Sequence, residues 1–358
     1  MPLDPAASQA PAVHDVATWL TRLPKAELHV HVVGAMRPTT LAALAALAAH
    51  HGVALPRSSA TLYQYRNFTE FIEVFRLAAR SLVTAGDFAR VAYEYIETGH
   101  RVGNLRYVEF FFNPSYHYPQ GVAYQTQLAG LVEGLTAAYQ DFGVRARLIP
   151  SIDREFGVAL AERVLDDVLA HPHEWVVGLG LDGPEDKGPP ERFASIFQRA
   201  GRAGLKRTAH VCEDYAPTPA TNYAVCRDVL GCERLDHGYR LLTDATLCAR
   251  AREDGVAFTC CPKPSTRDRD ASRLAAIHHM HALGLTITLA TDDPALFETD
   301  IGEAYQRVCL GTRLGVADAR ALALNAVQAA WLDEPSRTQL RREFEDEIDA
   351  LTRTFSAS

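Results

Sequence analysis

The sequence predicts an α/β fold: a (β/α)8 TIM barrel with extra helices after the first strand and at the C-terminus. Eight short apolar runs are typical of strands, and helical segments separate them. Strands that alternate with helices form parallel βαβ units, and eight such units close into a barrel. The length of 358 residues suits one barrel with insertions, because this fold usually needs about 250 residues.

The elements follow in a regular order. Residues 26–32 alternate between polar and apolar side chains and form the first predicted strand. A long and mostly helical stretch follows, which includes residues 39–49 and the amphipathic residues 68–102. This first connection is much longer than the later ones, so we expect it to place extra helices over the barrel mouth. Seven further strands are predicted at residues 107–112, 144–149, 175–181, 206–210, 233–237, 256–261 and 285–291.

The remaining helices and the domain boundaries complete the predicted architecture. No linker or low-complexity tract divides the chain, so we predict an N-terminal tail at residues 1–18 and one barrel domain at residues 19–358. Predicted helices include residues 190–203, 243–254 and 271–283, with further helices outside the barrel between residues 316 and 354.

The composition excludes several classes of protein. The net charge of -8 argues against a nucleic-acid partner, but it allows a neutral small-molecule substrate. No run approaches the roughly 20 apolar residues of a membrane span. The 7 cysteines form no disulfide framework, and the N-terminus resembles no signal peptide. We therefore expect a cytoplasmic protein; the sequence carries no feature that indicates an oligomeric state.

Unusual polar residues stand at the predicted carboxyl ends of the strands, where barrel enzymes carry their active sites. His29 and His31 end the first strand, and His210 ends the fifth. Asp292 and Asp293 follow the eighth strand. Side chains at positions i and i+2 of a strand share a face, so the first two imidazoles can reach one metal ion.

Each of these residues also has a structural interpretation. A His-x-His pair is often exposed or part of a core, and Asp292 or Asp293 before Pro294 is typical of a helix N-cap. The arrival of a third histidine and a carboxylate at equivalent strand ends favours a metal site. Three histidine nitrogens and one aspartate oxygen suit one Zn²⁺ with an open coordination position. The other cluster, His278, His279 and His281, is predicted to lie on a solvated helix face.

The sequence resembles the adenosine/adenine deaminase family of metal-dependent hydrolases. The segments that carry the resemblance occur in order over most of the chain. They are LPKAELHVHVVGAMRP at 23–38, FFNPSYHYPQGV at 111–122, GLGLDGPE at 178–185, GPPERF at 188–193, AHVCE at 209–213, RLDHGYR at 234–240 and TDDPALF at 291–297.

The resemblance implies hydrolytic deamination of a 6-aminopurine: adenosine, adenine or a 5′-modified adenosine such as aminofutalosine. It also implies the four metal ligands given above, His29, His31, His210 and Asp292, holding one Zn²⁺ per chain.

The same resemblance implies roles for four further residues. His237 matches the histidine that orients and deprotonates the attacking water, and Glu213 matches the acid that protonates the purine ring. Gly183 and Asp293 match groups that hydrogen-bond other ring nitrogens. Attack on the ring builds negative charge, so Glu213 should carry a proton at that moment. We expect burial in an apolar barrel mouth to favour the protonated form.

The sequence departs from the family at three places near the site. Val33 stands where the family usually has an acidic residue that receives a sugar hydroxyl, so a free base or a purine with an apolar 5′ substituent becomes more plausible than adenosine. Cys212 replaces a small residue, and we expect it to narrow the pocket. Pro264 and Ser265 replace the usual Ser-Asn pair.

Two other functions remain open at this point. The chain could hydrolyse another amino-heterocycle, an amide or an ester on the same barrel. Two-metal relatives of that kind commonly use a carboxylated lysine at the end of the fourth strand, whereas Lys187 lies well past it. A non-catalytic binding protein on this barrel would be expected to lack a metal ligand or the acid, and this sequence has all of them.

Overall fold

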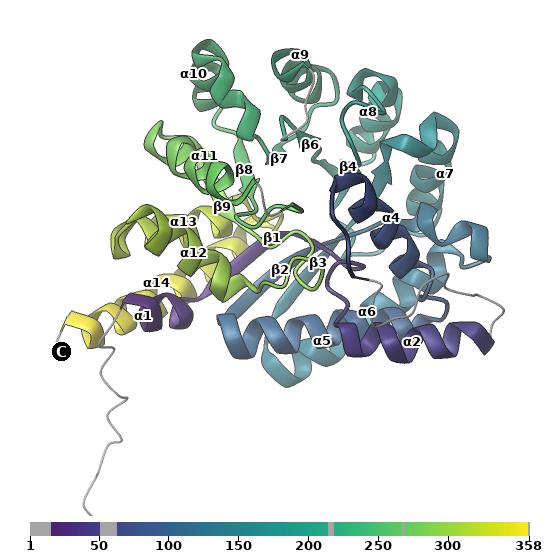
Figure 1. Cartoon of the computed structure of the whole chain (residues 1–358), viewed down its shortest axis with the longest axis horizontal. Helices are drawn as coiled ribbons and strands as arrows, with labels where there is room; N and C mark the ends of the chain where they lie inside the picture. The colour runs from purple at the N-terminus through teal and green to yellow at the C-terminus, as the bar shows by residue number, and fades with distance from the viewer. Residues whose placement is uncertain (1–15, 51–62, 214–217, 267–268, 357–358) are drawn as a thin grey trace, which may run out of the picture.

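The computed structural model describes residues 16–50, 63–213, 218–266 and 269–356. Parallel strands form a central barrel, and the helices surround it in sequence order, so that the colours of Figure 1 run around the ring. The predicted α/β barrel is therefore confirmed. Its strands are β1 (Lys25–His31), β2 (Leu105–Phe112), β3 (Arg145–Asp153), β4 (Gly178–Asp182), β5 (Lys206–Arg207), β6 (His210–Val211), β7 (Arg234–His237), β8 (Ala257–Cys260) and β9 (Thr286–Leu289).

The predicted fifth strand, residues 206–210, is divided into β5 and β6. Strands β1 to β5 form one hydrogen-bonded sheet, and β6 to β9 form another. Thr208 lies in the gap, but its backbone N–H donates to Leu179 O at 3.1 Å and its carbonyl accepts from Leu181 N at 3.2 Å. Because this ladder continues through the gap, β5 and β6 act as one strand of an eight-stranded barrel.

Backbone hydrogen bonds close the barrel between its first and last strands. Val30 and Asp292 form a parallel bridge. His31 N donates to Asp292 O at 2.9 Å, and Asp292 N donates to His29 O at 3.1 Å. The closure thus joins the two strand ends that carry candidate metal ligands.

The predicted helices are present with shifted ends. Helix α1 begins at Val16, so residues 16–18 are helical rather than part of the predicted tail; residues 1–15 lie outside the described residues. The amphipathic run at 68–102 is divided in two, because Thr84 begins a new helix with a capping box completed by Asp87. The helices are α1 (Val16–Arg22), α2 (Pro38–His50), α4 (Phe68–Ala79), α5 (Ala85–Gly103), α6 (Tyr124–Phe142), α7 (Gly157–Ala170), α8 (Ala194–Arg202), α9 (Pro219–Ala224), α10 (Ala245–Glu253), α11 (Asp270–Ala282), α12 (Ile301–Thr312), α13 (Val316–Ala329) and α14 (Glu334–Ser356).

Short helical turns complete the connections between these elements. A π-helical turn, η5 (Val225–Val229), continues α9. The 3-10 turns are η1 (Pro114–Tyr116), η2 (Tyr118–Gln120), η3 (Arg154–Phe156), η4 (Pro190–Phe193) and η6 (Tyr239–Thr243).

The long first connection places α4 at the barrel mouth. Asn67 caps this helix by accepting a hydrogen bond from Glu70 N, and Phe71 and Phe75 lie on its buried face. At the other end, Arg76 forms ion pairs with Asp153, which ends β3, and with Glu155, which follows it. The predicted extra helices over the mouth are therefore confirmed for α4.

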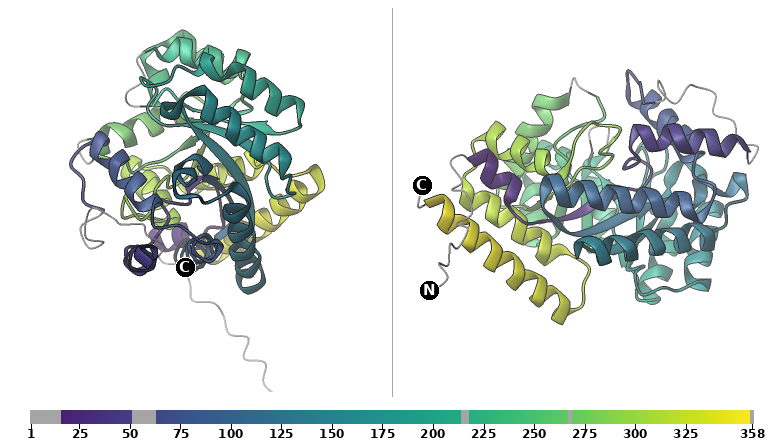
Figure 2. Two further views of the ribbon diagram at one scale, coloured as in Figure 1. Left: turned by 90° about the vertical axis from the view of Figure 1, so that its right-hand side faces the viewer. Right: turned by 90° about the horizontal axis from the view of Figure 1, so that it is seen from below.

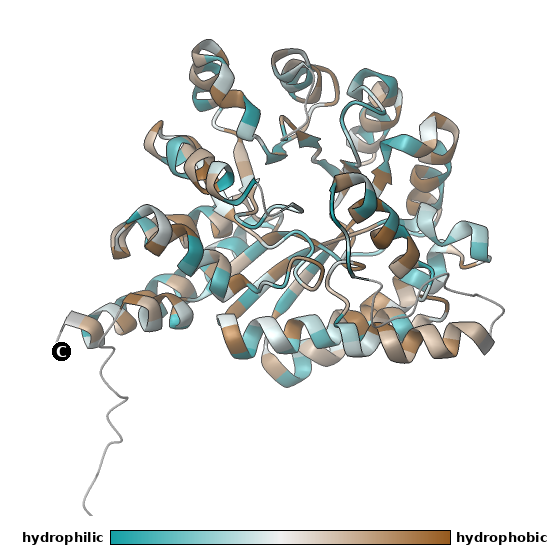
Figure 3. Ribbon diagram, viewed as in Figure 1, coloured by the Kyte–Doolittle hydropathy of each residue, from teal (hydrophilic) through white to brown (hydrophobic). Residues whose placement is uncertain are grey.

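The C-terminal helices pack outside the barrel. Helix α14 lies beside α1, as two views in Figure 2 show. The surrounding helices carry both hydrophobic and hydrophilic residues (Figure 3), and one core extends from Trp19 to Leu351. Among the described helices, none combines the length and the apolar composition needed to cross a lipid bilayer.

A buried ion pair joins the barrel interior to the C-terminal segment. Arg234 Nη1 donates to Glu109 Oε2 at 2.7 Å, and both side chains are almost fully inaccessible. Tyr107 Oη and Trp331 N donate to the other carboxylate oxygen. The Arg234 guanidinium lies 4.0 Å from the centre of the Trp331 ring. Removing one partner would leave an uncompensated buried charge, which is far more costly than losing a surface pair.

We expect Arg234→Met to lower the free energy of unfolding by about 3–5 kcal/mol, measured by urea denaturation. The control is Arg250→Met, which breaks an exposed pair with Asp228 and should cost less than about 1 kcal/mol. Adding Glu109→Gln to Arg234→Met should recover part of the loss. Equal effects of the two single substitutions would show that the buried pair contributes no more to the free energy of unfolding than the exposed pair does.

Candidate metal centre and active site

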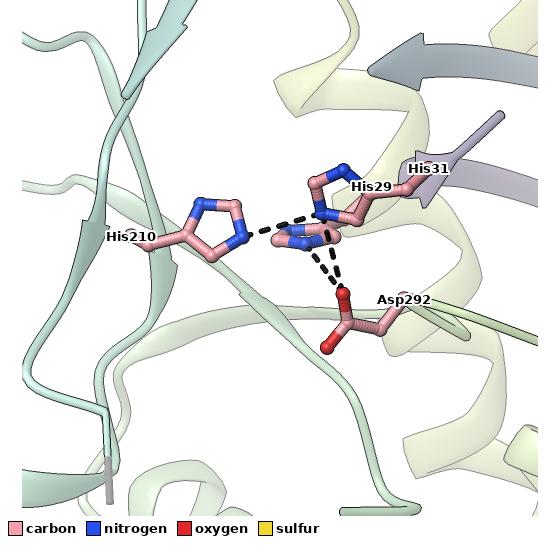
Figure 4. Close-up of side chains that lie close together, drawn as sticks. All are labelled: His29, His31, His210 and Asp292. Carbon is pink, nitrogen blue, oxygen red and sulfur yellow. Dashed lines mark hydrogen bonds and ion pairs between the residues drawn. The ribbon is translucent and has the colours of Figure 1, made fainter. Parts of the chain in front are cut away.

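Three histidines and one aspartate converge at the mouth of the barrel. His29 and His31 come from β1, His210 from β6 and Asp292 from the segment after β9 (Figure 4). Each offers one ligand atom, and these four atoms lie within 4.8 Å of one another. Asp292 Oδ1 is 3.2 Å from His29 Nε2 and 3.4 Å from His31 Nε2, which in turn is 3.3 Å from His210 Nε2. The four residues that the sequence placed at strand ends therefore do meet.

The donor set fits a zinc ion. His29 Nε2 is buried and has no hydrogen-bond partner in the described part of the chain, although it faces a carboxylate oxygen. The Nε2 atoms of His31 and His210 face each other. A cation between these atoms would accept a lone pair from each of the four ligand atoms. Three imidazoles and one carboxylate form a ligand set that Zn²⁺ accepts.

The electrostatics of the cluster also favour a cation. Burial disfavours the charged form of His29, but the carboxylates of Asp236 and Asp292 outweigh it and raise the pKa of His29 to about 10. Burial raises the pKa of Asp292, yet the imidazoles of His29 and His31 beside its carboxylate hold that pKa well below its usual range. A metal ion would meet the same carboxylates, so its binding should displace a proton.

Three residues around the site have strained backbone conformations. Cys212, His237 and Asp292 all have positive φ angles, of 55°, 70° and 65° respectively. Such angles are costly for residues other than glycine, and they concentrate at functional sites. Each of the three lies at or just after the carboxyl end of a barrel strand.

The predicted acid and base lie together above the cluster. Glu213 follows β6, and its Oε2 is 3.9 Å from Nε2 of His237, which ends β7. The Glu213 backbone N–H donates to Glu185 Oε1 at 2.9 Å. The His237 ring is buried, with its centre 4.9 Å from that of His29 and 4.8 Å from that of His210. Burial, reinforced by the charge of His210, lowers the pKa of His237 well below its usual value.

Besides the apolar wall of its pocket, Glu213 has a buried cation beside it. Arg273, a buried residue of α11, places Nη2 3.6 Å from Glu213 Oε1. Its Nη1 donates to Cys261 O at 3.1 Å, and its guanidinium lies 4.1 Å from the centre of the Tyr239 ring. The expectation that burial favours the protonated form of Glu213 stays a prediction.

The two predicted substrate-binding residues line the same pocket. Gly183 follows β4 with φ of 86°, a conformation that favours glycine. Asp293 is buried, and its Oδ1 has no hydrogen-bond partner in the described ranges. Burial, together with the charge of Asp292, raises the pKa of Asp293 well above its usual range. Gly34 lies against this side chain, since an added Cβ would be 1.9 Å from Asp293 Oδ1.

The pocket has a polar floor and an apolar wall. Most of the apolar wall comes from one face of α4, and Tyr116 and Phe297 add to it. Cys212 is fully buried and does not line the pocket, so the expected narrowing by its side chain is wrong, whereas Ser265 does line it. The lining residues are His31, Phe68, Phe71, Ile72, Phe75, Asn113, Tyr116, Asp182, Gly183, His210, Glu213, His237, Ser265, Asp292, Asp293 and Phe297.

Sequence reasoning missed some residues at the site. Asn113 Nδ2 donates to both oxygens of Asp182 at 3.1 and 2.9 Å, and these residues follow β2 and end β4. Their positions at strand ends could have identified them. Arg273 carried no such signal, because it stands in an ordinary amphipathic helix. The prediction for His278 and His279 is confirmed, since both are exposed on α11.

Comparisons with known proteins agree with this geometry. The model of a family described as adenosine deaminase matches residues 24–348. An adenine deaminase of Streptomyces coelicolor is 34% identical over 340 residues, which are 92% of this chain and 96% of the relative.

Two solved structures are similar over almost their whole length. An amidohydrolase from Burkholderia ambifaria with bound Zn has a TM-score of 0.86 at 34% identity, covering 99% of this chain and 98% of the other. An adenine deaminase from Arthrobacter aurescens has a TM-score of 0.82 at 29% identity, covering 92% and 99%. The family match and the relatives confirm the resemblance read from the motifs, and the chain belongs to the adenosine deaminase family.

Proposed function

We propose that this chain is a zinc-dependent hydrolase that removes the exocyclic amino group of a 6-aminopurine, with adenine as its substrate. One observation carries the proposal: the His29, His31, His210 and Asp292 cluster forms the floor of a pocket that also holds a potential acid and base. The relatives named adenine deaminase and the zinc-containing amidohydrolase support it. The pocket lies at the carboxyl ends of the strands, as in other barrel enzymes.

The four ligands would hold one zinc ion per chain. When bound, zinc supplies Lewis acidity that makes a water molecule acidic near neutral pH. In the loop after β4, Lys187 is exposed and pairs with Asp186, so among the described residues no lysine of that loop reaches the cluster. This argues for a single metal ion rather than the two-metal alternative.

The side chains around the pocket then divide the proton transfers. His237 is buried and neutral, so it can accept a proton from the attacking water. Glu213 delivers a proton to the ring nitrogen beside the carbon under attack, which takes up the developing negative charge. The proton that His237 accepted then passes to the amino group, which leaves the tetrahedral carbon as ammonia. The hydroxyl that remains on this carbon returns its proton to Glu213 as the carbonyl forms.

Two further groups orient the ring. The Gly183 backbone N–H donates to one ring nitrogen. Burial raises the pKa of Asp293, and the protonated form of this carboxyl donates a hydrogen bond to the lone pair of the imidazole-side nitrogen, N7. Both groups form hydrogen bonds with ring nitrogens of a purine, and neither hydrogen bond requires a sugar on the base.

The wall of the pocket favours a free base over a nucleoside or a nucleotide. Val33 is buried and offers no acceptor where the family usually binds a sugar hydroxyl, and a buried hydroxyl without a partner costs roughly 1–3 kcal/mol. Within the described residues, the pocket lining contains no lysine or arginine that could bind a phosphate, while Asp182 adds an acidic group. The phenylalanines of α4 would tolerate an apolar substituent.

Glu213→Gln should retain zinc and lose at least about 100-fold in turnover, because general acid catalysis usually contributes 10²–10⁴-fold. Metal content is measured by elemental analysis and turnover by ammonia release. The control Glu191→Gln changes an exposed glutamate and should leave both unchanged. Full activity of Glu213→Gln would refute the acid role.

The role of Asp293 can be tested with a ligand that lacks its partner. Asp293→Ala should lower kcat/KM for adenine by about 5- to 150-fold, the equivalent of roughly 1–3 kcal/mol for a lost buried hydrogen bond, whereas Asp293→Asn keeps a donor and should lose less. The wild-type protein should bind 7-deazaadenine, which has no N7 lone pair, more weakly than adenine. In Asp293→Ala that difference should vanish. If it persists, Asp293 does not contact N7.

An ammonia-release assay over several purines tests the substrate. We expect kcat/KM to be highest for adenine, lower for an adenosine with an apolar 5′ substituent, lower again for adenosine and lowest for AMP. The order follows from the missing hydroxyl acceptor and from the carboxylates of the pocket floor. A preference for AMP would contradict the assignment of a free base.

A further inference from the structure

A single buried carboxylate, Asp236, lies behind the metal cluster. It belongs to β7 and is fully inaccessible to solvent. Each of its oxygens accepts a hydrogen bond from a buried threonine: Thr259 Oγ1 donates to Oδ1 at 2.8 Å, and Thr208 Oγ1 donates to Oδ2 at 2.9 Å. These two donors come from different strands of the barrel, so the position and orientation of the carboxylate are fixed from both sides.

The same two oxygens face two of the three histidine ligands. Asp236 Oδ1 is 3.3 Å from His29 Nδ1, and Oδ2 is 3.4 Å from His210 Nδ1. His29 Nδ1 is also 2.9 Å from Thr259 Oγ1, whose own proton goes to Asp236. The threonine oxygen is thus the acceptor in this contact, and His29 Nδ1 must carry a proton.

This arrangement determines which ring nitrogen is left for a metal. A proton on Nδ1 leaves the lone pair of a neutral imidazole on Nε2. In both rings Nε2 is the atom that faces the cluster, toward Asp292 in the case of His29 and toward His31 in the case of His210. The hydrogen bond with Thr259 thus fixes the tautomer of His29. His210 Nδ1 makes no hydrogen bond within the described residues, but the carboxylate that faces it favours the same tautomer in that ring.

The third histidine is supported differently. His31 Nδ1 is 3.9 Å from Asp182 Oδ2, beyond hydrogen-bond distance, and the Asp182 oxygens already accept from Asn113. Asp236 and Asp182 are both buried carboxylates beside ligand histidines, and only Asp236 faces two of them. This difference makes Asp182 a matched control.

We propose that Asp236 is a positioning residue that sets the zinc affinity of the site by holding His29 and His210 with Nδ1 protonated and Nε2 directed at the metal. The proposal rests on the proposed zinc centre. Partners of this kind raise the basicity of metal-bound histidines, and their loss typically weakens metal binding by about 10- to 100-fold. Asp236 touches neither the pocket nor the substrate.

Asp236→Asn preserves the shape and one acceptor oxygen, but it removes the charge and places an N–H₂ group against one of the two Nδ1 atoms. We expect its dissociation constant for zinc, measured on apoprotein by competition with a chromogenic chelator, to rise about 10- to 100-fold. Asp182→Asn should change the constant several-fold less. Thr208→Val removes one hydrogen-bond donor to Asp236 while keeping the carboxylate. It should also raise the dissociation constant for zinc less than Asp236→Asn does.

A second measurement does not depend on a folded variant. In the zinc-loaded wild-type protein, ¹⁵N–¹H spectra of the histidine side chains should show protonated Nδ1 and metal-bound Nε2 for both His29 and His210. The opposite tautomer in either ring would overturn the proposal. Equal zinc affinity of Asp236→Asn and the wild-type protein would overturn it while leaving the proposed function intact. Failure of the wild-type protein to bind zinc would instead overturn the proposed function and this inference with it.

Discussion

The closure of the barrel between β1 and the segment after β9 is the constraint on which the site depends. Two backbone hydrogen bonds, His31 N to Asp292 O and Asp292 N to His29 O, join the first and last strands. They align the three residues laterally, so that both imidazoles and the carboxylate reach one point. His210 reaches the same point because it lies at the corresponding level of its own strand. Metal binding and barrel closure are therefore parts of one arrangement.

This arrangement concentrates charge and strain that the rest of the fold must support. The histidines and carboxylates of the site are buried, and three strand-end residues have left-handed backbone conformations. Each feature costs free energy when considered alone. A continuous apolar core, together with buried ion pairs such as that of Arg234 and Glu109, compensates for it. The barrel thus supplies the stability, and its mouth carries the chemistry.

The pocket combines two environments with different functions. Its floor is polar and holds groups that move protons or read the edge of a purine ring. Its wall is formed largely by the aromatic face of α4, which Arg76 ties to Asp153 and Glu155. An apolar wall excludes water from the ring under attack and offers nothing to a sugar or a phosphate. Arg273 adds a buried cation 3.6 Å from the carboxyl of Glu213.

The sequence by itself determined the barrel, the eight strands and the four candidate ligands, because strand periodicity and the residues that end each strand are local properties. His29 and His31 share a face since strands alternate, and no other part of the chain is needed to predict it. The tertiary structure alone decided that the fifth strand is interrupted, that Arg273 reaches Glu213 and that Asp236 serves two histidines. Asp236 lies more than two hundred residues from His29 along the chain. Contacts over such separations are fixed by how strands and helices pack around the barrel, and they leave no periodic trace in the sequence.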